Sequence, residues 1–228
     1  MRWPSSTLPL PRAGLIALAA FLLAGLALAL LLSQLGYRLR AVTPPTAASA
    51  VDIGFAQTMS RHHQQAIGLA RQLLDGRPTG LAPLAQRMLE TQLVELGEMR
   101  GWLRLWGASL HPPASGAMDW MLRGQRPPDA ALRQYLLDCA RAPGGMVGLA
   151  TAEDLLALNR LEGRARDARF LELMLAHHEG GLPMARLAAR EAALPVVRRL
   201  AAEVLREQSE EIRTMRLTLD VLAAKAEP

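Results

Sequence analysis

The chain has 228 residues and a formal net charge of +5, and Lys225 is its only lysine. Acidic residues are interleaved with the arginines instead of leaving one basic patch, so the charge pattern argues against a nucleic-acid partner. An aromatic content of 4%, together with abundant alanine, leucine and arginine, favours an all-α fold. The single cysteine, Cys139, excludes an intramolecular disulfide and is expected to be a half-buried helix residue.

The N-terminal region is predicted to contain a transmembrane anchor. Residues 13–32 have no charged or strongly polar side chain, and a helix of this length spans roughly 30 Å of hydrocarbon. We expect a short tail at 1–12, the transmembrane helix at 13–35 and a flexible linker at 36–50. A cleaved signal sequence is the alternative, because Ala48-Ser49-Ala50 resembles a cleavage site.

The orientation of this anchor does not follow from charge, because arginines flank it almost equally on both sides. The tail that precedes it is short, which favours a single-pass protein of the cell membrane with residues 51–228 on the extracytoplasmic side. The lipid bilayer is then one expected partner, and the sequence does not identify a protein partner.

The remainder of the chain contains an internal repeat. Residues 52–63 and 167–178 share an aspartate, a phenylalanine, a methionine and a histidine pair at an offset of 115. Residues 84–99 and 200–215 share a glutamine, a glutamate and a methionine at an offset of 116. Matches at a nearly constant offset indicate a duplicated unit.

Each copy has the helical periodicity of a hairpin. Repeat one, 52–106, is expected to form helices at 52–75 and 81–106, and repeat two, 164–224, helices at 164–191 and 195–224. Two hairpins predict a four-helix bundle, joined by a long crossover at 107–163 with short helices. Pro183 lacks an N–H and crowds the carbonyl of Glu179, so a kink is expected just after His178.

The side chains expected to carry chemistry lie on the inward arcs of these helices. At 100° per residue, both histidine pairs fall on apolar arcs, close to a methionine in each copy. On the partner helices, Glu95 and Glu211 share the inward arc with a glutamine and a methionine. No arginine shares that arc, and a buried carboxylate needs a partner, so we expect each glutamate to meet the histidines.

Two interpretations of this network remain open. Each glutamate can simply hydrogen-bond a histidine and fix the helix register. The exact duplication and the combination of imidazole with thioether instead favour a transition metal ion, copper first, with iron or manganese possible. The candidate metal ligands are His62, His63, His177, His178, Glu95, Glu211, Met59, Met174, Met184, Met99 and Met215. A methionine stripe is also typical of an ordinary core, and His111, beside two prolines, is expected in a solvated loop.

At these residues the sequence resembles DUF305, a bacterial family with a ferritin-like helical bundle and members implicated in copper binding. The resemblance is carried by FAQTMSRHHQQAI, QLVELGEMRGW, FLELMLAHHEGGLPMA and EQSEEIRTM. It implies that both histidine pairs, with Met59, Met174 and Met184, are the ligands. Family members often have a crossover rich in methionine and histidine. Here only Met118, Met121 and Met146 lie near it, which argues against a high-capacity copper store.

The sequence therefore predicts a membrane-anchored extracytoplasmic metal-binding protein for copper handling or resistance, with no catalytic residue. A ferritin-like di-metal oxidase using iron or manganese is one alternative, although the Glu-x-x-His motif of such enzymes is absent. A structural envelope interaction module is the other.

Overall fold

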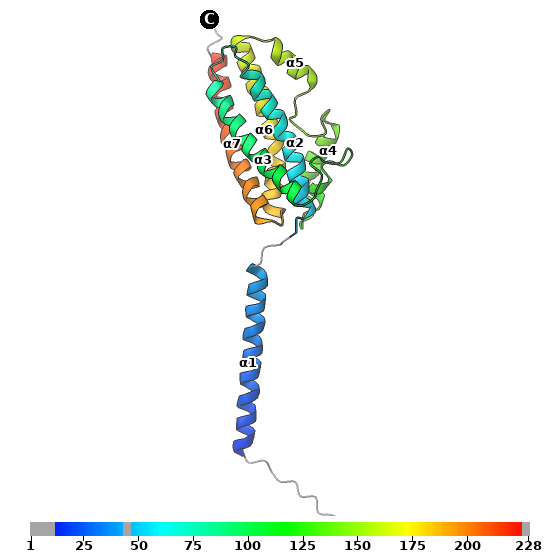
Figure 1. Ribbon diagram of the computed structural model, residues 1–228, viewed down its shortest axis with the longest axis vertical. Helices are drawn as coiled ribbons and strands as arrows, with labels where there is room; N and C mark the ends of the chain where they lie inside the picture. The colour runs from blue at the N-terminus through cyan, green and yellow to red at the C-terminus, as the bar shows by residue number, and fades with distance from the viewer. Residues whose placement is uncertain (1–11, 43–46, 225–228) are drawn as a thin grey trace, which may run out of the picture. The chain divides into compact units, whose positions relative to one another are not determined.

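A computed structural model describes residues 12–42 and 47–224, and within those ranges every regular element is a helix (Figure 1). The all-α prediction is confirmed. Nearly all of the expected tail at 1–12 lies outside the described residues, as does Lys225. The elements are α1 (Arg12–Val42), α2 (Ala50–Leu73), α3 (Ala82–Leu105), the short 3-10 helix η1 (Asp119–Leu122), α4 (Ala130–Arg141), α5 (Ala152–Arg160), α6 (Gly163–Glu191) and α7 (Pro195–Ala224).

Helix α1 belongs to a unit of its own, separate from the rest of the chain. Its segment Ile16–Gly36 has a mean hydropathy of 2.6 and is long and apolar enough to cross a membrane. A signal sequence near the N-terminus has the same properties as an anchor. The helix continues to Val42, and so occupies part of the region that the sequence suggested as a linker.

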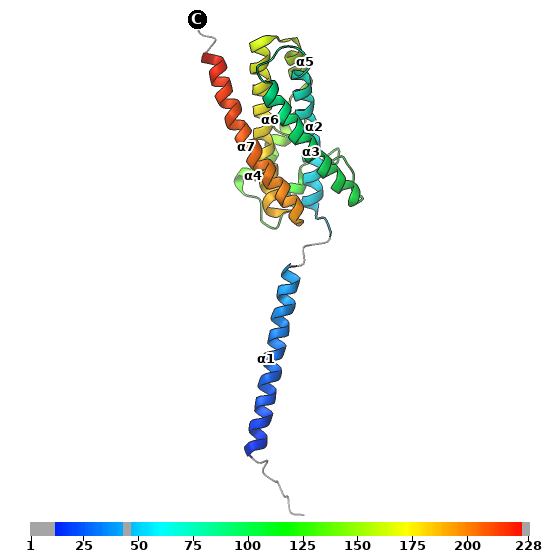
Figure 2. The same cartoon turned by 60° about the vertical axis from the view of Figure 1, so that its left-hand side comes forward.

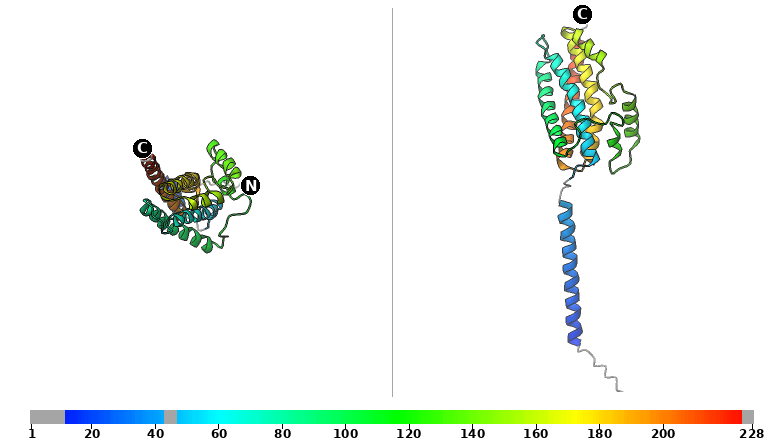
Figure 3. Two further views of the ribbon diagram at one scale, coloured as in Figure 1. Left: turned by 90° about the horizontal axis from the view of Figure 1, so that it is seen from above. Right: turned by 45° about the vertical axis from the view of Figure 1, so that its right-hand side comes forward.

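The four long helices of the second unit form two hairpins. Helix α2 pairs with α3, helix α6 pairs with α7, and the hairpins meet mainly along α2 and α6, which run side by side (Figure 2). The crossover between Leu105 and Gly163 runs outside these helices and includes η1, α4 and α5 (Figure 3). This arrangement places the duplicated histidine pairs on the two central helices.

The duplicated aspartates join the two repeats. Asp52 closes a capping box with Ser49 at the start of α2, and it also accepts hydrogen bonds from the backbone N–H groups of Ala193 and Leu194 in the α6–α7 turn. Asp167, its counterpart near the start of α6, accepts from Thr79 Oγ1 and Gly80 N in the α2–α3 turn. Each repeat thus holds the hairpin turn of the other, which requires α2 and α6 to run antiparallel.

The buried apolar side chains form two clusters. One contains Phe55 and Met59 of α2 with Met184 of α6, and the other contains Leu69 of α2 with Phe170 and Met174 of α6. Along both central helices the histidines lie between the segments that supply these clusters. The histidines therefore make a polar layer in the middle of the core.

The crossover packs directly on the backbone of α6. A Cβ on Gly180 would lie 2.1 Å from the carbonyl oxygen of Val147, and Tyr135 Oη donates a hydrogen bond to the Gly180 carbonyl at 2.8 Å. Only glycine at position 180 allows this approach. Helix α6 is assigned as continuous through Pro183, and the kink expected after His178 stays a prediction.

Candidate metal centre

Four histidines form the polar layer: His62 and His63 from α2, and His177 and His178 from α6. All four are fully buried, as their positions on the apolar arcs predict. In the centre, the rings of His62 and His177 pack against each other across the helix interface, with centroids 3.7 Å apart and planes inclined by 33°. The ring centroid of His63 lies 6.4 Å from that of His62, and the ring centroid of His178 lies 6.0 Å from that of His177.

The outer histidines are paired with the duplicated glutamates. His63 Nε2 lies 2.7 Å from Glu95 Oε2, and His178 Nε2 lies 2.6 Å from Glu211 Oε2. A carboxylate accepts hydrogen bonds, so in each pair the proton is assigned to Nε2 and the lone pair to Nδ1. Each glutamate orients a ring and leaves its second nitrogen available, an arrangement common around metal-bound imidazoles.

The inner histidines are neutral. Burial lowers the pKa of His62 and of His177 well below the ordinary value, and the neighbouring histidines lower it further. His177 Nε2 donates a hydrogen bond to the backbone carbonyl of His62 at 2.9 Å, which again leaves Nδ1 with the lone pair. Neutral imidazole is the form that binds metal ions.

Buried polar atoms without a hydrogen-bond partner are concentrated in this layer. They include Nδ1 of all four histidines, Nε2 of His62, and both amide atoms of Gln92 and of Gln208. Leaving one such atom unsatisfied costs about 1–3 kcal/mol, and folded proteins tolerate few of them. Nine in one layer indicate that the layer accommodates a further polar partner.

Carboxylates from α3 and α7 gather at the edge of the layer. The Glu95 and Glu211 side chains are 9% and 22% exposed, and Glu207, one turn before Glu211, is 34% exposed. Burial raises the pKa of Glu207, and repulsion by the Glu95 and Glu211 carboxylates raises it further. Negative charge thus extends from the surface to the buried histidines and attracts cations.

The arrangement resembles known proteins over the whole hairpin region. A comparison with protein-family models matches residues 52–219 to DUF305, a domain of unknown function. The chain belongs to the DUF305 family. A comparison with curated proteins gave no match.

Solved DUF305 structures share the fold. A Streptomyces coelicolor DUF305 protein, described as secreted, is 30% identical with a TM-score of 0.63, covering 76% of this chain and 94% of its own. A Deinococcus radiodurans DUF305 fragment is 26% identical with a TM-score of 0.58, covering 76% of this chain and 98% of its own. CopM in its Cu(II)-bound form is 25% identical with a TM-score of 0.54, covering 74% of this chain and 95% of its own.

The predicted methionine ligands of this DUF305 chain are all fully buried. Met59, Met99 and Met184 belong to one apolar cluster, and Met174 and Met215 belong to the other. They therefore lie on both sides of the histidine layer. Each glutamate meets a histidine as expected, but in the described part of the chain no three His, Cys, Asp or Glu side chains are arranged to hold one ion. Thioether or amide ligands, or a rotamer change, are needed to complete a site.

Two glutamines complete the layer, although the sequence did not mark them as ligands. Gln92 and Gln208 lie one turn before Glu95 and Glu211, and each is 3% exposed. Their shared arc and their duplication were visible in the sequence. What periodicity cannot show is that both amides lack a partner.

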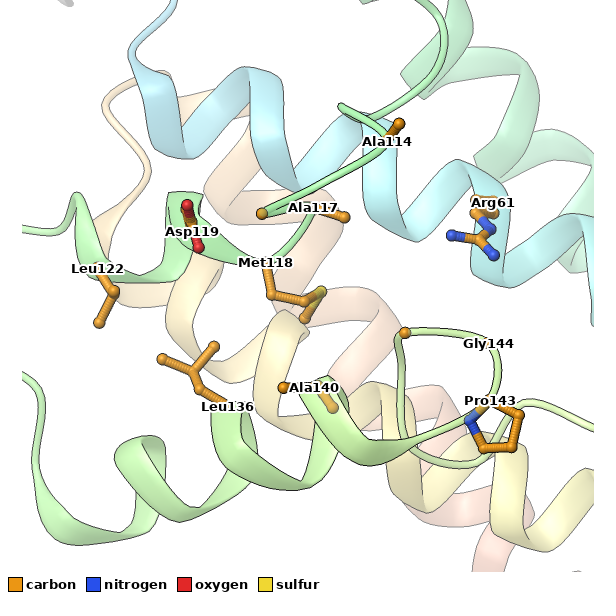
Figure 4. A pocket seen from close by; sticks show the side chains of 13 residues that line it. Arg61, Ala114, Ala117, Met118, Asp119, Leu122, Leu136, Ala140, Pro143 and Gly144 are labelled. Carbon is orange, nitrogen blue, oxygen red and sulfur yellow. The ribbon is translucent and has the colours of Figure 1, made fainter.

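The crossover of this DUF305 chain carries a separate pocket of about 430 Å³ (Figure 4). Arg61 faces it from α2 and Met118 from the crossover, and Cys139 also lines it. Cys139 is fully buried, and burial raises the pKa of its thiol. His111 lies exposed in the loop that precedes η1. None of the four buried histidines lines this pocket, which mixes one cation and one carboxylate with apolar groups.

Proposed function

We propose that this DUF305 protein binds a copper ion in its histidine layer and serves copper handling or resistance without catalysing a reaction. The observation that carries the proposal is the set of buried nitrogen and amide atoms without partners around four imidazoles. Neutral imidazole with thioether groups nearby is a donor set suited to copper. CopM, a structural relative, has been crystallised in Cu(II)-bound and Cu(I)-bound forms, which supports copper as the ion.

In this proposal the glutamates contact the histidines and do not ligate the ion themselves. Glu95 and Glu211 hold the outer rings through Nε2, so that Nδ1 faces a ligand, and their charge offsets that of a bound cation. Each carboxylate serves one histidine, and the two do not share a group. A di-iron or di-manganese oxidase needs carboxylates that ligate or bridge its ions, so this geometry gives the oxidase alternative no support.

We further propose that α1 anchors the protein in the cell membrane by a single pass, with the hairpins on the extracytoplasmic side. The apolar segment Ile16–Gly36 supports a membrane location, and the description of the Streptomyces relative as secreted supports export.

The test is copper binding by the untagged full-length chain in detergent, measured by competition with a coloured chelator. The wild type should bind copper, and replacing all four layer histidines by alanine should abolish the binding. Circular dichroism checks that the variant remains helical.

A finer variant separates metal binding from a purely structural network. Glu95→Gln with Glu211→Gln preserves shape but weakens ring orientation, so we expect copper affinity to fall roughly 10–100-fold. Glu90→Gln, which lies on the exposed face of α3, is the control and should leave affinity unchanged. Absence of copper binding by the wild type would refute the proposal and leave the structural role.

A further inference from the structure

The two halves of the histidine layer are not equivalent, although the chain is duplicated. His177 Nε2 donates a hydrogen bond to the backbone carbonyl of His62. The duplication leads one to expect the reciprocal bond from His62 to the carbonyl of His177. Instead both ring nitrogens of His62 lack a partner, which is true of no other histidine in the layer. His62 is therefore the imidazole with the most unused bonding capacity.

The difference coincides with one residue that breaks the repeat. At the offset of 115, Gly181 of α6 corresponds to Ala66 of α2. A Cβ on Gly181 would lie 2.9 Å from Cε1 and 3.5 Å from Nδ1 of His62. The contact with Cε1 is too close for the ring to keep its place. The missing methyl group thus leaves room for the edge of His62 against α6, whereas Ala66 has a methyl at the equivalent position on α2.

The amide of Gln208 also lies close to Gly181, and it too lacks a hydrogen-bond partner. The same Cβ would lie 3.1 Å from Oε1 of Gln208, a residue of α7 that is 3% exposed. Neither amide atom of Gln208 has a hydrogen-bond partner. A ring nitrogen from repeat one and an amide oxygen from repeat two thus both lie close to Gly181. Buried imidazole nitrogen and amide oxygen are both metal ligands, and nitrogen with oxygen donors suits Cu(II).

We propose that the layer has one preferred Cu(II) position, between His62 Nδ1 and Gln208 Oε1 where both side chains lie against Gly181. This rests on the proposed function and refines it, because two equivalent sites, one in each repeat, would follow from the duplication alone. The site is shared between repeats: α2 supplies the imidazole, α7 the amide, and α6 the glycine that lets both approach. At the equivalent position of α2, Ala66 carries a methyl group.

The first test adds a methyl group at position 181 of the full-length protein, where it would push His62 and Gln208 away from α6. We expect Gly181→Ala to lower Cu(II) affinity at least tenfold in chelator competition. Alanine is a better helix former than glycine, so the substitution does not weaken α6 by propensity. Gly68→Ala is the matched control, because a Cβ there meets nothing within 4 Å. This control variant should bind Cu(II) within about twofold of the wild type.

The second test replaces the amide that would ligate copper by a carboxylate. It remains informative if Gly181→Ala does not fold. Gln208→Glu places a carboxylate oxygen beside His62 and should tighten Cu(II) binding at least threefold. Gln92→Glu makes the same change in repeat one and should have no comparable effect. Equal effects of the two substitutions, or full affinity in a folded Gly181→Ala variant, would overturn the asymmetric site while leaving copper binding intact. Lack of binding by the wild type refutes the proposed function itself.

Discussion

A buried imidazole without a carboxylate partner is favoured in its neutral form, and the inner histidines of the layer illustrate how neighbours enforce this. His62 and His177 are surrounded by apolar side chains above and below and by other imidazoles at their own level. Burial and mutual repulsion both disfavour the charged state, so the pKa of each is lowered. The same environment that makes the imidazoles costly to protonate leaves their lone pairs available to a metal ion.

The lowered pKa values predict how stability depends on pH in the metal-free protein. The unfolded chain takes up protons on these histidines below about pH 6.5, whereas the folded protein does not. Stability should therefore be full above that pH and decrease as the pH falls toward the lowered pKa values. Each histidine contributes at most about 1.4 kcal/mol per pH unit.

Urea unfolding between pH 7.5 and 5.0 measures this slope. His62→Leu should reduce it by about one proton, and His111→Ala, which changes an exposed histidine, should not. A slope that is the same in the wild type and in His62→Leu would contradict the assignment of His62 as buried and neutral.

The sequence could identify part of this layer but not all of it. Helical periodicity is sufficient to turn both histidine pairs and both glutamates inward, and a buried carboxylate without an arginine must find another partner. It cannot choose which histidine each glutamate meets. It also gives no reason to distinguish Gly181 from Ala66, because both are small residues on an apolar arc. That difference depends on which side chain of another helix lies opposite.

At the scale of elements, the hairpins are tied together by residues whose role is invisible in the sequence. In the sequence, Asp52 and Asp167 are recognisable only as matching residues of the repeat. In the structure each carboxylate bonds the turn of the opposite repeat, at opposite ends of the hairpins. The helices themselves followed from apolar periodicity, whereas these contacts link residues 87 to 142 positions apart and have no local signal.

These ties predict a matched loss of stability. Asp52→Ala and Asp167→Ala each remove a carboxylate that accepts two hydrogen bonds from a part-buried turn of the other repeat, so each should lower the free energy of unfolding by about 1–3 kcal/mol. The double variant should be additive, because the sites are far apart. Thermal unfolding followed by circular dichroism tests this, with the exposed Asp220→Ala as the control. A strongly unequal effect of the two substitutions would show that the pseudo-symmetric ties are not equivalent in energy.

At the scale of the whole molecule, the internal repeat accounts for the meeting of histidines at the centre of the fold. The two hairpins pack mainly through α2 and α6, which carry the matching histidine pairs, so His62 meets its counterpart His177 there. The all-α class and the family could be predicted because repeats and helical periodicity are local patterns. The packing of the hairpins and the backbone contacts of the crossover with α6 depend on residues that are far apart in the sequence. They could not be predicted from local patterns.

Whether α1 stays attached to the chain decides whether the two hairpins remain at the membrane. An uncleaved anchor keeps an apolar helix of this length in the bilayer, because removing it would expose its whole hydrocarbon surface to water. The full-length protein should therefore stay with membranes through an alkaline carbonate wash, while a chain that begins at Ala47 should be soluble. N-terminal sequencing of the mature protein discriminates the alternative: a first residue of Val51 would show that α1 is a signal sequence, and that residues 51–228 are released from the membrane after export.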